Sequence, residues 1–146
     1  MFLKEFNRDE AVSFINLVNQ FANVDHVIAR EEKKLIDDYR RELELEEDSI
    51  SELPYSNIIT TLKRSRERTK RIVYFELVGL ALVDGNYGDV EVDFLDKVAV
   101  DLDINRSQKI AFANFFYNFK EIHDFSAIET ESKNLKHLEE QAEALL

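Results

Sequence analysis

The sequence contains no cysteine, only one proline and only three glycines in 146 residues. The absence of cysteine excludes a disulfide scaffold, a zinc finger and thiol chemistry. Because proline and glycine mark turns and irregular loops, their scarcity predicts long helices with few connections. No stretch approaches the roughly 20 apolar residues that span a bilayer, and the amino terminus lacks the apolar segment of a signal peptide. We therefore expect a cytoplasmic protein without a membrane span.

Positive charge is also in short supply. Lysine and arginine number 19 against 30 aspartates and glutamates, which gives a net charge of −11. Nucleic acid is therefore a poor candidate partner, since affinity for it comes largely from neutralising phosphates. The acidic balance is compatible with cation binding or with docking to a basic surface. The length and a hydrophobic fraction of 45% suit one domain with one core.

Apolar residues recur at helical spacing through most of the chain. The expected helices run over about 9–22, 30–45, 56–64, 67–83, 90–102, 105–122 and 127–146. Three of the expected helix starts have the spacing of a capping box. In this motif, two residues three positions apart each accept a hydrogen bond from the other's backbone amide through the side chain. The three pairs are Asn7 with Glu10, Asn105 with Gln108, and Ser126 with Glu129. We expect a single-domain, all-α bundle of about seven helices, with a core over 9–122 and a C-terminal helix over 127–146.

An internal repeat becomes visible when Asp25 is aligned with Asp84. A glutamate follows each aspartate by seven residues, at Glu32 and at Glu91. The apolar positions then correspond as well: Leu35 and Ile36 with Phe94 and Leu95, Tyr39 with Val98, Leu43 with Leu102, and Leu45 with Ile104. The pattern predicts a duplicated helix–loop–helix unit, folded as two hairpins that share one core about a pseudo-twofold axis.

The second copy resembles the tellurite-resistance TerB-like family in the run 81–85, Ala-Leu-Val-Asp-Gly, followed by Glu91. The first copy departs from that pattern, because His26 stands where glycine is usual and Ala29 where a helix cap is common. The resemblance covers roughly 14–119. It implies a small helical bundle that serves as a stress-response or scaffold module and not as an established enzyme. It also implies a metal site formed by the paired acids Asp25, Glu32, Asp84 and Glu91.

Each of these four acids also has a local interpretation. A glutamate in the first turn of a helix is stabilised by about 0.3–1 kcal/mol, and an aspartate at a helix exit can accept from backbone amides. If the hairpins pack side by side, however, the carboxylates share one region and need a cation, a basic side chain or raised pKa values. Oxygen ligands favour Ca²⁺, Mg²⁺ or Mn²⁺ over Zn²⁺, with His26 and Asp89 as candidate outer ligands.

A basic block interrupts the acidic sequence between residues 63 and 71. Its candidate partner-binding residues are Arg64, Arg66, Arg68, Lys70 and Arg71. The block suits contact with phosphate, an acidic membrane surface or an acidic partner. The alternative, which we favour, is that these side chains pair with acids elsewhere in the fold.

The last helix carries a narrow apolar stripe at Ile128, Leu135, Leu138, Ala142 and Leu145. This stripe either docks back on the bundle, the favoured alternative, or pairs with a partner protein or a second copy as a homodimer. No nucleophile, phosphate-binding loop or histidine motif indicates catalysis, so we expect a protein that is not an enzyme.

Overall fold

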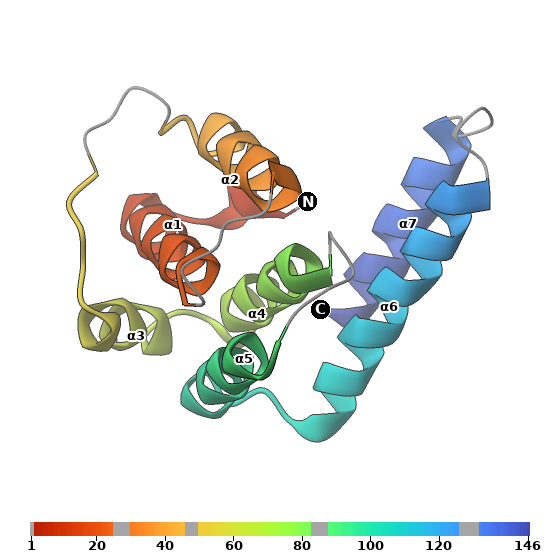
Figure 1. Ribbon diagram of the computed structural model, residues 1–146. Helices are drawn as coiled ribbons and strands as arrows, with labels where there is room; N and C mark the ends of the chain where they lie inside the picture. The colour runs from red at the N-terminus through yellow and green to blue at the C-terminus, as the bar shows by residue number, and fades with distance from the viewer. Residues whose placement is uncertain (1, 25–29, 46–49, 83–87, 126–131) are drawn as a thin grey trace.

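The computed structural model describes residues 2–24, 30–45, 50–82, 88–125 and 132–146, and within these ranges its regular structure is entirely helical. The elements, labelled in Figure 1, are the 3₁₀ helix η1 (Leu3–Glu5) and the α-helices α1 (Arg8–Ala22), α2 (Arg30–Glu42), α3 (Tyr55–Lys63), α4 (Glu67–Leu82), α5 (Asp89–Asp101), α6 (Arg106–Phe125) and α7 (Ser132–Leu145). The expected all-α bundle is confirmed. None of the helices in these ranges is both long and apolar enough to cross a membrane.

Local capping explains two of the helix starts. At α1, the Asn7 Oδ1 atom accepts from the Glu10 amide and the Glu10 Oε1 atom accepts from the Asn7 amide, each at 2.9 Å. Asn105 and Gln108 exchange the same pair of hydrogen bonds at 2.8 and 3.0 Å before α6. Both predicted capping boxes are therefore confirmed, while the third, at residues 126 and 129, lies outside the described residues.

The helix α4 lies at the centre of the bundle (Figure 1) and packs against α2, α3, α5 and α6. Every residue from Ile72 to Val78 is buried, which is typical of a stretch with apolar residues on all sides of the helix. Its Phe75 ring contacts three aromatic rings of α6, with centroids 4.7–5.5 Å apart: Phe112, Phe115 and Phe116. These contacts join the last hairpin to the rest of the core.

The helices α2 and α5 have the same length, 13 residues, and end in the same way. Just after each helix, a residue adopts a left-handed conformation, Glu44 with φ 58° and Asp103 with φ 59°. The next amide then reaches back five residues at 2.8 Å, from Leu45 to Arg40 and from Ile104 to Ala99. These features recur 59 residues apart, the offset of the sequence repeat. They support the predicted duplication, which stays a prediction.

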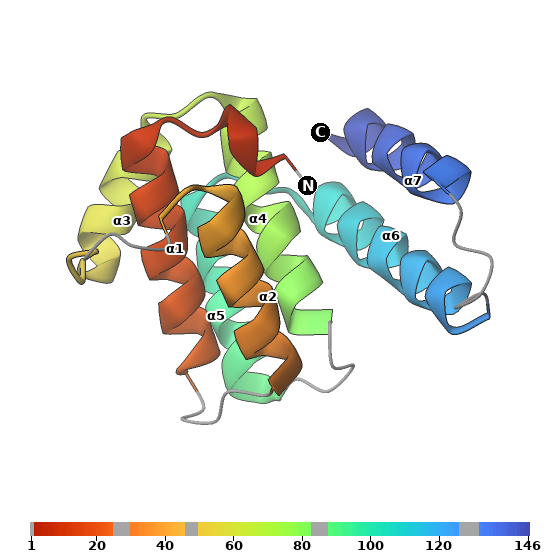
Figure 2. The ribbon, with the colours of Figure 1, turned by 90° about the horizontal axis from the view of Figure 1, so that it is seen from above.

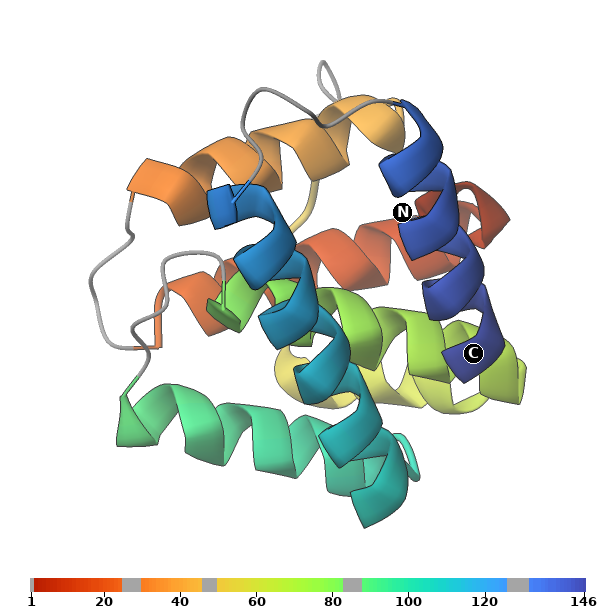
Figure 3. The same ribbon diagram turned by 90° about the vertical axis from the view of Figure 1, so that its right-hand side faces the viewer.

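The helices α6 and α7 form a hairpin beside α4 (Figures 2 and 3). On α7, Leu138 is 3% exposed and Ala142 is fully buried, so this part of the apolar stripe packs within the chain. That arrangement is the intramolecular docking favoured from the sequence. Ile128 and the side chain of Leu135 lie outside what the structure describes.

Candidate functional site

Two of the four predicted metal ligands, Glu32 and Glu91, occupy equivalent places. Each is the third residue of its helix, in α2 and α5 respectively, and their exposed fractions are 5% and 6%. Each begins a stripe that continues one and two turns later with buried apolar residues, at Ile36 and Tyr39 in α2 and at Leu95 and Val98 in α5. Both glutamates therefore belong to the inward face of their helix and not to the solvated one.

A carboxylate buried to this degree needs a hydrogen bond, an opposite charge or a cation to offset its lost hydration. Neither Glu32 nor Glu91 is without a partner. Glu10 shows how a buried glutamate is held when its role is structural. It is also the third residue of its helix and is 9% exposed, and its two oxygens accept from the Asn7 amide and the Ser65 hydroxyl. Glu10 therefore provides a comparison for Glu32 and Glu91, since it has the same helix position and similar burial.

The helix ends around these glutamates lie at one end of the bundle. Figures 2 and 3 show the C-terminal ends of α1 and α4 beside the starts of α2 and α5. The helices α2 and α5 therefore start at the same end of the bundle and not at opposite ends. Glu32 and Glu91 therefore enter the core from the same end of the molecule.

The structure gives less information on the remaining predicted ligands. Asp25, His26 and Asp84 lie outside the described residues, while Asp89 is exposed as the first residue of α5. Among the residues that the structure describes, no three histidines or acids come close enough to hold a metal ion. Of the predicted ligands, the described part of the structure therefore brings Glu32 and Glu91 to the same end of the bundle.

A buried polar pair, which the sequence reasoning missed, joins α2 to α4. The Tyr39 hydroxyl donates toward the backbone oxygen and the Oε2 atom of Glu76, both 3.3 Å away. Burial and the adjacent Glu76 carboxylate raise the pKa of Tyr39 well above its ordinary value, so the phenol stays neutral at physiological pH. The available signal was Glu76 itself, the one acid within the apolar stretch from Ile72 to Leu82.

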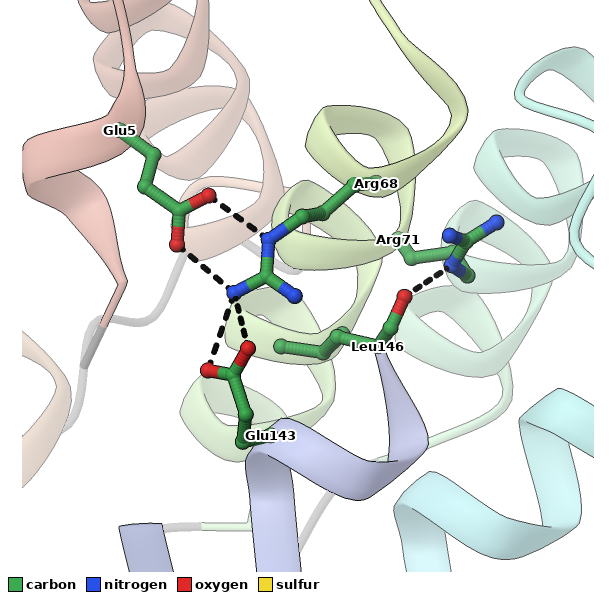
Figure 4. A network of polar contacts seen from close by, with 5 residues as sticks. All are labelled: Glu5, Arg68, Arg71, Glu143 and Leu146. Atoms are coloured by element: carbon green, nitrogen blue, oxygen red, sulfur yellow. Dashed lines mark hydrogen bonds and ion pairs between the residues drawn. The ribbon is translucent and has the colours of Figure 1, made fainter. Parts of the chain in front are cut away.

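The basic block is largely engaged within the chain (Figure 4). Arg68 donates from Nε and Nη2 to the two carboxylate oxygens of Glu5, at 2.7 and 2.9 Å, and its Nη2 atom also lies 2.9 Å from Glu143. The guanidinium thus holds η1, α4 and α7 together. The hydrogen bond from Arg68 lowers the pKa of Glu5 below its ordinary value.

The other members of the block divide into two groups. Lys70 is 7% exposed and pairs with Glu67 at 3.3 Å, and the Arg71 Nε atom donates to the backbone oxygen of Leu146 at 2.8 Å. Arg64 and Arg66 are exposed. Internal pairing therefore accounts for three of the five predicted partner-binding residues and leaves two at the surface.

No protein-family model, curated protein or solved structure matches the chain. The resemblance to TerB-like proteins accordingly rests on the residues quoted above.

Proposed function

We propose that this protein is a non-enzymatic, TerB-like module that binds a divalent cation at the end of the bundle where α2 and α5 begin. Its carboxylate ligands would be Glu32 and Glu91 together with Asp25 and Asp84, and His26 and Asp89 would lie further out. A stress-response or scaffold role follows from the same resemblance. Binding would act by joining the two hairpins at that end.

The observation that carries this proposal is the matched burial of Glu32 and Glu91, at 5% and 6% exposure, in equivalent positions at one end of the bundle. A glutamate whose only role is to face the helix dipole needs no burial, because the dipole acts on exposed side chains as well. Two buried carboxylates at the same end of the bundle offer oxygen ligands there, and a bound cation would offset the hydration that they lose on burial.

The ligand chemistry selects the class of ion. Carboxylate oxygens suit the hard cations Ca²⁺, Mg²⁺ and Mn²⁺, whereas Zn²⁺ prefers nitrogen and sulfur ligands. The chain has no cysteine, which removes sulfur ligands other than its single methionine. We therefore expect Ca²⁺, Mg²⁺ or Mn²⁺ to bind more tightly than Zn²⁺.

The test is thermal unfolding of the full chain in EDTA and after addition of each ion. An ion at 100 times its dissociation constant stabilises the folded state by about 2.7 kcal/mol. For a chain of this size, that corresponds to a rise in Tm of roughly 5–10 °C. Glu32→Gln and Glu91→Gln should each remove most of the rise.

The comparison without ions makes the test sharper. In EDTA, each glutamine variant changes only the interaction that its glutamate already has within the chain, and its stability there is the baseline for that variant. With the cation, the wild type should rise above its own baseline, and the glutamine variants should rise much less. Glu10→Gln is the matched control for burial and helix position, and Asp93→Asn is the control for lost surface charge. Both should keep the full response, and the absence of a response to every divalent ion would refute the proposal.

A further inference from the structure

The buried pair of Tyr39 and Glu76 lies where one half of the bundle packs against the other. The first half consists of α1 packed on α2, and the second half consists of α4 packed on α5. The halves meet where α2 packs on α4, which is the place of this pair. They also meet where α1 approaches α5, with the rings of Phe21 and Phe94 5.8 Å apart.

The repeat relates these two contacts to each other. An offset of 59 residues carries α2, 30–42, onto α5, 89–101, and carries α1 onto α4 within one residue at each end. The same offset relates Tyr39 to Val98 of α5 and Glu76 to Leu17 of α1. Val98 and Leu17 are both fully buried. The fold therefore accepts two apolar side chains at one contact and has a tyrosine and a glutamate at the equivalent places of the other.

Stability alone gives no reason for this polar pair. Burial removes a hydroxyl and a carboxyl group from water, and the hydrogen bond of 3.3 Å between them offsets that loss only in part. Replacing both partners of such a pair by apolar side chains is often neutral or stabilising, whereas removing one partner is costly. The best-attested use of a buried polar group is to specify which surfaces pair.

We propose that Tyr39 and Glu76 determine which half of the bundle packs on which. Two equivalent halves can also pair between two chains, first half on first half and second half on second half, by exchange of elements between copies. Tyr39 would then face Leu17 of the other copy and lose its carboxyl acceptor. Glu76 would face Val98 of the other copy and lose the Tyr39 hydroxyl. The pairing of a first half with a second half keeps this hydrogen bond, so the pair disfavours the exchanged dimer. This inference rests on the equivalence of the two halves and is independent of the cation site.

The experiment is refolding of the full chain from urea at roughly 5 µM and 500 µM, followed by sedimentation velocity. It is run in EDTA, so that its outcome does not depend on a cation. The wild type should refold to the same species at both concentrations. Tyr39→Phe keeps the ring and removes only the hydroxyl, which abolishes the preference for one pairing over the other. At the higher concentration, it should form at least roughly tenfold more exchanged dimer than the wild type.

The double variant Tyr39→Val with Glu76→Leu tests the same idea without leaving a lone polar group in the core. It gives both contacts apolar residues, as Val98 and Leu17 already do. It should be more stable to heat than either single variant, because neither polar group remains buried without the other. It should also refold to more exchanged dimer than the wild type, which separates pairing preference from stability.

Two controls should refold like the wild type at both concentrations. Glu76→Gln keeps an oxygen that accepts from the Tyr39 hydroxyl, so it keeps the pair while removing the charge. Ile58→Val removes a methylene group from a fully buried residue of α3, outside both halves, and so controls for lost stability alone. Circular dichroism should show that every variant is folded.

The proposal is overturned if Tyr39→Phe and the double variant refold to the wild-type species at the higher concentration. It is also overturned if Ile58→Val or Glu76→Gln forms as much dimer as Tyr39→Phe. The first result would show that the two polar groups do not select the pairing, and the second that any weakened core has the same effect.

Discussion

Replacing Arg68 with methionine should loosen the contact of both ends of the chain with the central helix. Arg68 on α4 binds Glu5 through two hydrogen bonds, contacts Glu143 on α7, and lies with its Cζ atom 5.7 Å from the centre of the Phe2 ring. Methionine keeps much of the aliphatic stem, so the substitution removes the charge and its hydrogen bonds while much of the packing remains. The two glutamates would then lose the guanidinium that they share.

The size of the effect follows from the exposure of the three groups. The side chains of Arg68 and Glu5 are 28% and 32% exposed, and that of Glu143 is 55% exposed. Exposed ion pairs contribute about 0.2–1 kcal/mol, and two-pronged arginine–carboxylate pairs lie at the upper end. We assign about 1 kcal/mol to the Glu5 pair and about 0.5 kcal/mol to Glu143. The expected loss is about 1.5 kcal/mol, or roughly 3–6 °C in Tm.

The assay is urea denaturation of the wild type and of Arg68→Met at several pH values. Because Arg68 lowers the pKa of Glu5 in the folded state, the stabilisation from this pair is present above the unfolded pKa of about 4.3. It is lost as the pH falls through the lower folded value. The difference between the two proteins should therefore be full near neutral pH and should shrink below about pH 4.

Arg64→Met is the control, since Arg64 is an exposed arginine of the same basic block. Its stability should stay within about 0.5 kcal/mol of the wild type at every pH. The reasoning would be refuted by an Arg68→Met protein that is as stable as the wild type at neutral pH. It would also be refuted by a loss of equal size at pH 3 and pH 7, which would indicate packing as the cause and not charge.

Two further predictions concern the backbone. Gly79→Ala would place a Cβ atom 2.8 Å from the Phe116 ring, which packs on Phe75, so crowding should exceed the helix-propensity gain and destabilise the protein by roughly 1 kcal/mol in urea denaturation. A Gly79→Ala protein more stable than the wild type would contradict this prediction and show that the Phe116 ring moves aside at little cost. Glu44→Gly and Asp103→Gly should each stabilise the protein by up to about 1 kcal/mol, because both residues have a positive φ in the same helix-ending motif. Opposite signs in thermal unfolding would contradict their equivalence.

The helices of this protein could be predicted from the sequence because their determinants are local. Apolar residues at helical spacing locate each helix, and capping boxes such as Asn7 with Glu10 act over three residues. The repeat was also visible, since equivalent helices need equivalent apolar stripes. The structure agrees with the expected helix bounds within a few residues, apart from η1, which was not expected, and the start of α7, since residues 126–131 are not described.

The site could be predicted only in part. The spacing of Glu32 and Glu91 indicated that they are equivalent, but a spacing does not say whether a glutamate faces solvent or the core. That depends on how α2 and α5 pack on the rest of the bundle, and packing determined that both are buried. The same limit applies to Tyr39 and Glu76, which are 37 residues apart in the sequence.

The sequence by itself determined the helical class, the helix positions and the paired acids, because these follow from interactions within a few residues of each other. Tertiary structure alone decided that Arg68 binds Glu5 and Glu143, which lie 63 and 75 residues away in the sequence. It also decided that Val92 and Ile110 line one groove, because the facing of two helices depends on the packing of the whole core.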